Sequence, residues 1–257
     1  MTDGKHSPHP DIVAHRGGSR YPENSLSGFR NAASYGVEQV ELDVHLTRDG
    51  HLVVMHDETL DQTSFGSGPI SAFTLDEIQA LRLRQIDESA PSLDQALAAL
   101  ASSPMRVRIE VKPGGSPGGY EETHRQVLSL ADKYGMSRRI TIMSFDPAAL
   151  AFFTRSGVPT SQSVWPSDQA SLETFRRVVE RAAEAGIDDL GLSFGRTTPA
   201  MLALVAEAGL TAGVWTVNDV SRLDYWLRQP VAYVLTDHPD LALRVRTGLK
   251  GLPLGSR

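Results

Sequence analysis

The sequence predicts an α/β fold, a (β/α)8 TIM barrel with a small insertion after the second strand. From Ile12 onward, short runs rich in β-branched residues alternate with helical stretches, a pattern typical of parallel strands joined by helical crossovers. Eight such strands can be recognised, and the 257 residues of the chain match the roughly 250 residues of one such barrel. We therefore expect residues 1–257 to form a single barrel domain.

The predicted strands are short and mostly apolar, as expected for strands covered by helices. An additional run at 51–57 follows the turn residues Asp49 and Gly50, so it is interpreted as the second arm of a hairpin rather than as a barrel strand. The eight barrel strands are predicted at 12–16, 39–46, 106–112, 140–145, 160–165, 189–194, 211–217 and 232–237.

Helices are predicted between these strands at 25–35, 92–100, 121–134, 147–155, 170–185, 199–208 and 220–228. Five of them are followed within two residues by glycine, the residue that most easily adopts the left-handed conformation that ends a helix. These glycines are Gly36, Gly135, Gly157, Gly186 and Gly209.

Residues 58–91 are more than a connection between a strand and a helix needs, and we interpret them as a cap-like insertion over the barrel mouth. Thr74 and Glu77 have the spacing of a capping box, which predicts a short helix inside the insertion. Phe65 and Phe73 are our candidates for apolar contacts between the insertion and the barrel.

The composition excludes several classes of partner and site. The formal charge is −6 and basic residues are scattered along the predicted helices, so we expect no nucleic-acid partner. The chain has no cysteine, so a metal would have to be held by oxygen or imidazole ligands.

No apolar run approaches the roughly 18–20 residues that span a bilayer, and the first ten residues are polar with two prolines. We therefore expect no signal peptide, no stable insertion into a membrane and a cytoplasmic location.

Three acidic residues are expected inside the barrel. Glu41 and Asp43 stand two apart on one strand and therefore project to the same face. On the next barrel strand, Glu110 and Lys112 share a face in the same way. Buried carboxylates need a partner or a metal, and with oxygen ligands Mg²⁺ or Ca²⁺ is favoured. The alternative is a solvated rim or a salt bridge to a nearby arginine.

Two histidines and an arginine are placed near the same mouth. His15 and Arg16 end the first strand, and His56 follows the hairpin. A single histidine at a strand end is commonly structural, but catalytic residues of such barrels lie at the carboxyl ends of the strands. Together with the acids, these groups suit phosphodiester cleavage, which needs cationic charge at the phosphoryl oxygens and two groups that exchange protons.

Three motifs carry a resemblance to a known family. The runs HRGGSRYPENSLSGF, VELDVHLTRDGHLVVMHD and IEVKP resemble the glycerophosphodiester phosphodiesterase family. The resemblance extends over about residues 12–240 and is dense only through Pro113. The family has a (β/α)8 barrel with a small insertion after the second strand, which agrees with the excess of residues at 58–91.

The resemblance also implies a role for each candidate residue. Residues that match the family's pattern are the metal ligands Glu41, Asp43 and Glu110, the catalytic acid/base pair His15 and His56, and the phosphate-binding Arg16 and Lys112. Trp215 matches an aromatic position near the family's site, and a tryptophan of the barrel core is the alternative interpretation.

The implied function is metal-dependent hydrolysis of glycerophosphodiesters, small-molecule substrates, to glycerol 3-phosphate and an alcohol. Two other hypotheses stay open: a lysophospholipase D-like or sphingomyelinase D-like enzyme acting on lipids, and a noncatalytic phosphate-binding barrel. The sequence also leaves open which alcohol is released, whether the metal is Mg²⁺ or Ca²⁺, and which histidine is the acid. It does not decide between direct attack by water and a cyclic phosphate intermediate, and it does not give the oligomeric state.

Overall fold

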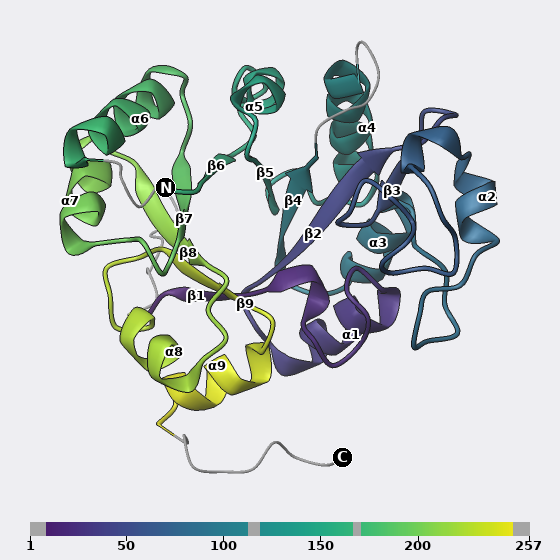
Figure 1. Ribbon diagram of the computed structural model, residues 1–257, viewed down its shortest axis with the longest axis horizontal. Coiled ribbons are helices and arrows are strands. Elements are labelled where there is room, and N and C mark those ends of the chain that lie inside the picture. Colours follow the sequence, from purple (N-terminus) through teal and green to yellow (C-terminus); the bar gives the residue numbers. More distant parts are fainter. Residues whose placement is uncertain (1–8, 113–118, 167–170, 249–257) are drawn as a thin grey trace.

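Eight parallel strands close into a barrel surrounded by helices, which confirms the predicted fold class (Figure 1). In this computed structural model, residues 9–112, 119–166 and 171–248 are described. The strand order is β1-β9-β8-β7-β6-β5-β4-β2, and pairing of β1 with β2 closes the ring. Two predictions fall partly outside the described residues. The expected absence of a signal peptide rested in part on the first eight residues, and one predicted helix starts at Ala170.

Each barrel strand is followed by a helix, except that the antiparallel β3 and the insertion come between β2 and α3. The strands are β1 Asp11–Ala14, β2 Gln39–Leu46, β3 Leu52–Val54, β4 Arg106–Val111, β5 Ile140–Ser144, β6 Thr160–Val164, β7 Asp189–Ser193, β8 Thr211–Trp215 and β9 Tyr233–Thr236. The helices are α1 Leu26–Tyr35, α2 Leu75–Gln79, α3 Leu93–Leu100, α4 Gly119–Lys133, α5 Pro147–Thr154, α6 Leu172–Glu184, α7 Pro199–Glu207, α8 Val220–Trp226 and α9 Pro239–Arg246.

Strand alternation separates an apolar outer face from a polar inner face. Val40, Leu42 and Val44 of β2 are almost fully buried in the main hydrophobic cluster, which includes residues of the surrounding helices. The intervening Glu41 and Asp43 point inward, and Asp43 pairs in register with Glu110 of β4. This register places the predicted acids next to each other.

Local capping chemistry agrees with the predicted helix bounds. Ser25, Ser92 and Thr198 accept a hydrogen bond from a backbone N–H of the first turn of α1, α3 and α7. The five glycines predicted to end helices have φ between 63° and 77°, in the left-handed region. Local sequence therefore fixes most helix ends.

The last helix, α9, was not predicted. It spans Pro239–Arg246, begins with proline in its first turn, and buries Ala242 and Val245. Its single short apolar stripe gives a weak periodic signal, whereas packing of α9 on α8 and β1 supplies the tertiary contacts that support it.

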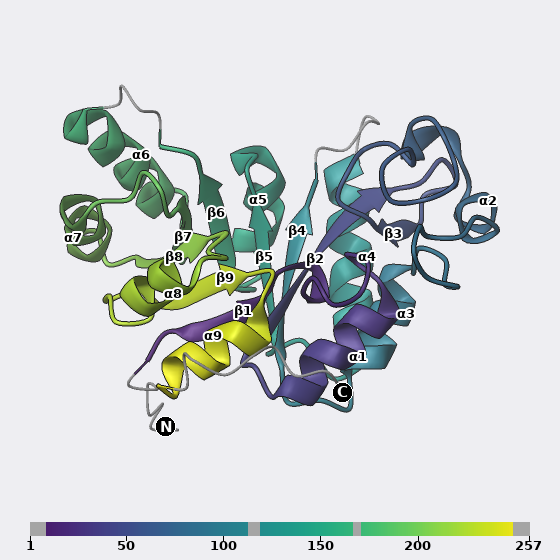
Figure 2. The ribbon, with the colours of Figure 1, turned by 60° about the horizontal axis from the view of Figure 1, so that its bottom comes forward.

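The insertion lies beyond β3, on the opposite side of the molecule from α6 and α7 in both views (Figures 1 and 2). It contains the predicted short helix, α2, with the Thr74–Glu77 capping box. A small hydrophobic cluster forms its interior, and Phe73 packs partly against that cluster. Phe65 is 66% exposed and faces the guanidinium of Arg84 at 5.0 Å, so its predicted apolar contact with the barrel is wrong.

Buried polar residues also fill the amino end of the barrel. Arg108 of β4 donates to Asp189 at 3.1 and 3.2 Å and to Gln39 at 2.9 Å, and its guanidinium lies 3.6 Å from the centre of the Tyr233 ring. A Cβ atom on Gly213 would lie 2.1 Å from Tyr233, so glycine is required there to seat the ring. The network closes this end of the barrel.

No helix in the described part of the chain is long and apolar enough to cross a membrane.

Candidate active site

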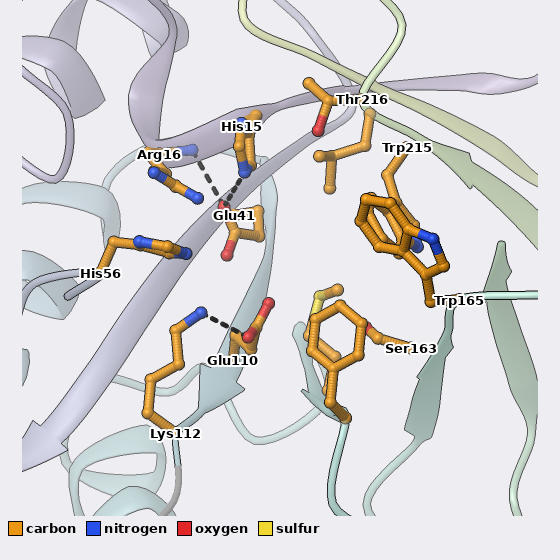
Figure 3. Close-up of a pocket in the computed structure, with 13 residues that line it drawn as sticks. His15, Arg16, Glu41, His56, Glu110, Lys112, Ser163, Trp165, Trp215 and Thr216 are labelled. Atoms are coloured by element: carbon orange, nitrogen blue, oxygen red, sulfur yellow. Dashed lines mark hydrogen bonds and ion pairs between the residues drawn. The ribbon is translucent and has the colours of Figure 1, made fainter. Parts of the chain in front are cut away.

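A cavity of about 240 Å³ opens at the carboxyl ends of the barrel strands and gathers the predicted site residues (Figure 3). Seven of the eight predicted residues line it, and the eighth, Asp43, lies in the acidic cluster that forms its floor. The lining residues are His15, Arg16, Glu41, His56, Glu110, Lys112, Met143, Phe145, Ser163, Trp165, Trp215, Thr216 and Leu235.

Glu41, Asp43 and Glu110 converge on one point. Each contributes a carboxylate oxygen, and these oxygens lie within 4.8 Å of one another. The three residues are 1%, 1% and 8% exposed. Three carboxylates in such a space repel each other unless cations balance them.

Two fixed cations partly balance the acids. Lys112 Nζ lies 2.5 Å from Glu110 Oε1 and 2.9 Å from Asp43 Oδ1, and Arg16 Nε lies 3.4 Å from Asp43 Oδ2. Burial alone would lower the pKa of Lys112, but Asp43 and Glu110 raise it above its ordinary value. Lys112 therefore remains a cation although it is mostly buried.

The balance is incomplete at two of the acids. Burial, together with the charges of Asp43 and Glu110, raises the pKa of Glu41 well above its usual range. Burial also raises the pKa of Glu110. Burial opposes ionisation of Asp43 too, but Lys112 and Arg16 bring its pKa below the ordinary value. Three carboxylates face two cations here, so ionisation of all three would leave an excess of negative charge.

The same residues fit a divalent cation. Glu41 Oε1 is buried and has no hydrogen-bond partner among the described residues, so a buried acceptor is available inside the cluster. The donors are all carboxylate oxygens, which suit Mg²⁺ or Ca²⁺ rather than a metal that prefers sulfur or imidazole. A bound dication would offset the excess charge.

His15 is held at the cavity by a residue 222 positions away. β1 ends at Ala14, and His15–Gly17 forms a single 3₁₀ turn, so the expected strand through Arg16 is shorter than predicted. Nδ1 of His15 lies 2.6 Å from Asp237 Oδ1. Asn218 Nδ2 donates to the other oxygen of Asp237 at 2.6 Å and keeps that carboxylate in place.

His56 has a similar arrangement. Its Nδ1 lies 2.7 Å from Oδ1 of Asp57, the next residue. Nε2 of the buried His45 lies 3.0 Å from the carbonyl oxygen of His56, which fixes the backbone after β3. Both histidines therefore have Nδ1 engaged by a carboxylate.

Arg16 adopts an unusual backbone conformation, with φ of 51°. Its backbone N–H donates to Glu41 Oε2 at 3.0 Å, and its guanidinium donates to Glu23 at 2.7 Å. Asn24, also left-handed with φ of 59°, donates from Nδ2 to Asp43 Oδ2 at 2.8 Å. The turns before and after Gly17 and Gly18 therefore place hydrogen-bond donors against Glu41 and Asp43.

An aromatic wall faces the histidines across the acids (Figure 3). The Trp215 ring lies 5.4 Å from that of Phe145 in an edge-to-face arrangement and 5.2 Å from that of Trp165. The predicted Trp215 therefore lines the cavity, while Phe145 and Trp165 were missed although both directly follow strands.

Four polar residues beside the site were also missed: Asp237, Asn218, Asn24 and His45. Asn24 lies inside the run HRGGSRYPENSLSGF, and Asp237 is the last residue of the strand predicted at 232–237. Their position at strand ends or in turns was visible, but their partners were not, because those partners are distant in the chain.

Comparison with known proteins gives a consistent result. Residues 15–241 match the model of the glycerophosphoryl diester phosphodiesterase family. A glycerophosphodiester phosphodiesterase of Caldanaerobacter subterraneus subsp. tengcongensis is 36% identical over 245 residues, which covers 92% of this chain and 98% of the relative.

Solved structures share the fold. Glycerophosphodiester phosphodiesterase of Thermotoga maritima superposes with a TM-score of 0.76 at 27% identity, over 94% of this chain and 100% of that one. A phosphodiesterase of Oleispira antarctica, in complex with the product sn-glycerol-3-phosphate, superposes with a TM-score of 0.81 at 24% identity, over 92% and 96% of the two chains. The resemblance carried by the three sequence motifs is therefore confirmed, and the chain belongs to the glycerophosphoryl diester phosphodiesterase family.

Proposed function

We propose that this protein hydrolyses glycerophosphodiesters to glycerol 3-phosphate and an alcohol. The observation that carries the proposal is the convergence of three carboxylates, two histidines and two cations in one cavity at the carboxyl end of the barrel. The names of the relatives support it, as does the structural neighbour in complex with sn-glycerol-3-phosphate.

Glu41, Asp43 and Glu110 would hold one divalent cation, Mg²⁺ or Ca²⁺. Such an ion supplies charge that stabilises the phosphoryl oxygens as negative charge develops on them. Arg16 and Lys112 line the same cavity and offer donors to a phosphate. A phosphodiester would thus meet positive charge from the protein as well as from the ion.

The two histidines are suited to move protons through the same ring atom. Because carboxylates engage Nδ1 of both rings, Nε2 is the atom left to face a substrate. One histidine takes a proton from the attacking oxygen as that oxygen bonds to phosphorus. The other donates a proton to the departing alcohol as the old P–O bond breaks.

The remaining parts of the cavity position the substrate. The wall formed by Phe145, Trp165 and Trp215 offers apolar surface to the carbon atoms of a glycerol unit. We further propose that residues 58–91 act as a cap beside the mouth of a single barrel domain. Their small hydrophobic cluster includes Val53 of β3 and Met55 immediately after it, which ties the insertion to the barrel.

A substrate panel with and without chelator tests this function. Purified protein should release glycerol 3-phosphate from at least one glycerophosphodiester, lose that activity in chelator and regain it with Mg²⁺ or Ca²⁺. No hydrolysis in the presence of either metal would reject the proposed function. Full activity in chelator, after dialysis against it, would reject the metal.

A thermal-unfolding measurement tests the ion independently of activity. At about a hundred times its Kd, the cation should stabilise the folded protein by about 2.7 kcal/mol. Glu41→Gln should abolish this stabilisation, whereas the matched surface change Glu122→Gln should keep it. Equal stabilisation of both variants would show that the ion binds elsewhere.

A further inference from the structure

A second cavity of about 410 Å³ adjoins the first one at His15 and Arg16. It lies between the loop after the 3₁₀ turn, which includes Ser19 and Tyr21, and the insertion, which contributes Gln62 and Arg84. The two cavities share His15 and Arg16 in their walls. The proposed function uses only the first cavity.

We propose that this second cavity is a subsite for the leaving alcohol and that it takes a polyhydroxylated alcohol, such as glycerol or another polyol. The inference rests on the proposed function and adds to it the chemical class of the leaving group. A phosphodiester carries one alcohol on each side of its phosphate. With the phosphate at His15 and Arg16, where the cavities meet, each alcohol has a cavity of its own.

The two cavities differ in the surface that they offer. The first contains the aromatic wall of Phe145, Trp165 and Trp215, which suits the carbon face of one glycerol. In the second, Tyr21 is the only phenylalanine, tyrosine or tryptophan among the described lining residues, and polar side chains predominate. A quaternary ammonium group binds best within a cage of several aromatic rings, which the second cavity does not offer in its described lining.

The charges in the second cavity also disfavour a cationic alcohol. Its two carboxylates already have partners, because Glu23 pairs with Arg16 at 2.7 Å and Asp237 pairs with His15 at 2.6 Å. Arg84 adds a cation, which is held over the Phe65 ring and donates to the carbonyl oxygen of Asp61 at 3.2 Å. A positively charged group would meet Arg84, and no carboxylate among the described lining residues is without a partner.

Hydroxyl groups, in contrast, would find both donors and acceptors. Gln62 and Gln85 each carry an amide that can donate and accept, and Thr63 carries a hydroxyl. Thr63 Oγ1 is buried and has no hydrogen-bond partner among the described residues. Rotation of the Thr63 side chain toward the cavity would let a polyol hydroxyl satisfy this atom.

Residues with an unusual backbone conformation lie in or next to the wall of the second cavity. Among the described residues, the non-glycine residues with positive φ are Arg16, Asn24 and Gln85. Arg16 and Gln85 line the second cavity, and Asn24 follows Glu23, which also lines it. Residues in such conformations gather at binding sites, where the surrounding structure holds them against their intrinsic preference.

The assignment places recognition of the alcohol in the insertion and recognition of the phosphate in the barrel. His15, which lines both cavities, is then the histidine beside the departing oxygen.

The test compares glycerophosphoglycerol with glycerophosphocholine, which share the glycerol phosphate unit and differ in the leaving alcohol. The wild-type protein, loaded with Mg²⁺ or Ca²⁺, should have a kcat/KM about tenfold or more higher on glycerophosphoglycerol. Gln62→Ala, Thr63→Val and Gln85→Gly should each lower that value about fivefold while changing kcat/KM on glycerophosphocholine less than twofold. Gln85→Gly removes the side chain while it keeps a residue that tolerates positive φ.

Gln79→Ala is the matched control, because Gln79 lies in the insertion but hydrogen bonds to Gln95, away from the cavity. Thr63→Val preserves side-chain shape, so it remains informative if a glutamine variant unfolds. A preference for glycerophosphocholine, or equal losses on both substrates, would overturn the subsite and leave the proposed function intact. Failure of the wild-type protein on every glycerophosphodiester would overturn both.

Discussion

The two ends of the barrel use buried charge in opposite ways, although the same strands supply it. At the amino end, β2 and β4 contribute Gln39 and Arg108, and at the carboxyl end they contribute Asp43 and Glu110. All four residues are less than 10% exposed. The two ends differ in whether each buried polar group has a hydrogen-bond or ion-pair partner inside the protein.

At the amino end the charges satisfy one another. Burial would lower the pKa of Arg108, but Asp189 raises it above its ordinary value. Burial, aided by the charge of Asp189, keeps the hydroxyl of Tyr233 protonated by raising its pKa. One cation, one anion and neutral hydrogen-bond partners leave no surplus charge for a ligand, so the network is structural.

At the carboxyl end the charges are not balanced, and a cavity adjoins them. Three carboxylates face Arg16 and Lys112, and the pKa of Glu41 is raised well above its usual range by burial and by its acidic neighbours. The difference teaches that burial of charge alone does not mark a site. The amino-end network also lines a cavity, so what distinguishes the carboxyl end is the surplus of buried charge of one sign beside its cavity.

Replacing Arg108 with methionine should produce the largest effect on stability. The change leaves Asp189 buried without its cation, which should cost about 3–5 kcal/mol of unfolding free energy in urea titrations. Activity per folded molecule should stay within twofold. The control is Arg106→Met, because Arg106 is half exposed and pairs with Asp11 at the surface, so its loss should cost below about 1 kcal/mol. If both variants lost the same unfolding free energy, the contrast between the buried ion pair of Arg108 and the partly exposed pair of Arg106 would be contradicted.

Replacing a histidine at the other end should affect catalysis instead of stability. His15→Ala and His56→Ala should each lower kcat by about a hundredfold or more, equivalent to about 2.7 kcal/mol, with little change in Tm. His51→Ala is a control, since His51 is 59% exposed on the hairpin.

An activated aryl leaving group needs no proton and should rescue the variant that lacks the general acid. If both variants kept wild-type kcat on glycerophosphodiesters, acid/base catalysis by these residues would be wrong.

Changing the carboxylate that holds His15 should have a smaller effect. Asp237→Asn keeps the shape of the side chain but removes the charged acceptor at Nδ1 of His15, so the ring loses its fixed orientation. We expect kcat to fall at least about tenfold while KM stays within twofold. Asp132→Asn, on the surface of α4, should change neither constant. A rise in KM at unchanged kcat would assign Asp237 to substrate binding alone.

The smallest effect concerns a partly buried pair, Glu38 and Arg246. Burial opposes ionisation of Glu38, but hydrogen bonds from Arg246 at 2.9 and 3.1 Å and from the N–H of Ile12 lower its pKa below the ordinary 4.5. A carboxylate with a lowered folded-state pKa stabilises the fold above its unfolded-state pKa and loses that contribution as pH falls through the folded-state value.

Arg246→Gln should therefore cost about 1 kcal/mol at pH 7, and the difference from wild type should shrink below about pH 4.5. Urea titrations of both proteins between pH 7 and pH 3 measure this. A constant difference across that range would show that Arg246 acts by packing and not through the charge of Glu38.

Much of the fold and site could be predicted because the relevant physics is local. Alternation along β2 placed Glu41 and Asp43 on the inner face, and parallel strands brought Glu110 into register with them. Serine and threonine caps and left-handed glycines fixed the helix ends. The family motifs then placed both histidines at the mouth.

The sequence by itself determined most of the strands and helices, though not α9, and which acids point inward, because these depend on periodicity and on neighbours a few residues apart. Only the tertiary structure decided that Asp237 holds His15, that Phe145 and Trp165 join Trp215, and that Phe65 points to solvent. The contact between Asp237 and His15 arises when the barrel closes and β9 pairs with β1, two segments more than 200 residues apart. The aromatic contacts join the ends of different strands, 50 and 70 residues apart, and no local pattern relates them.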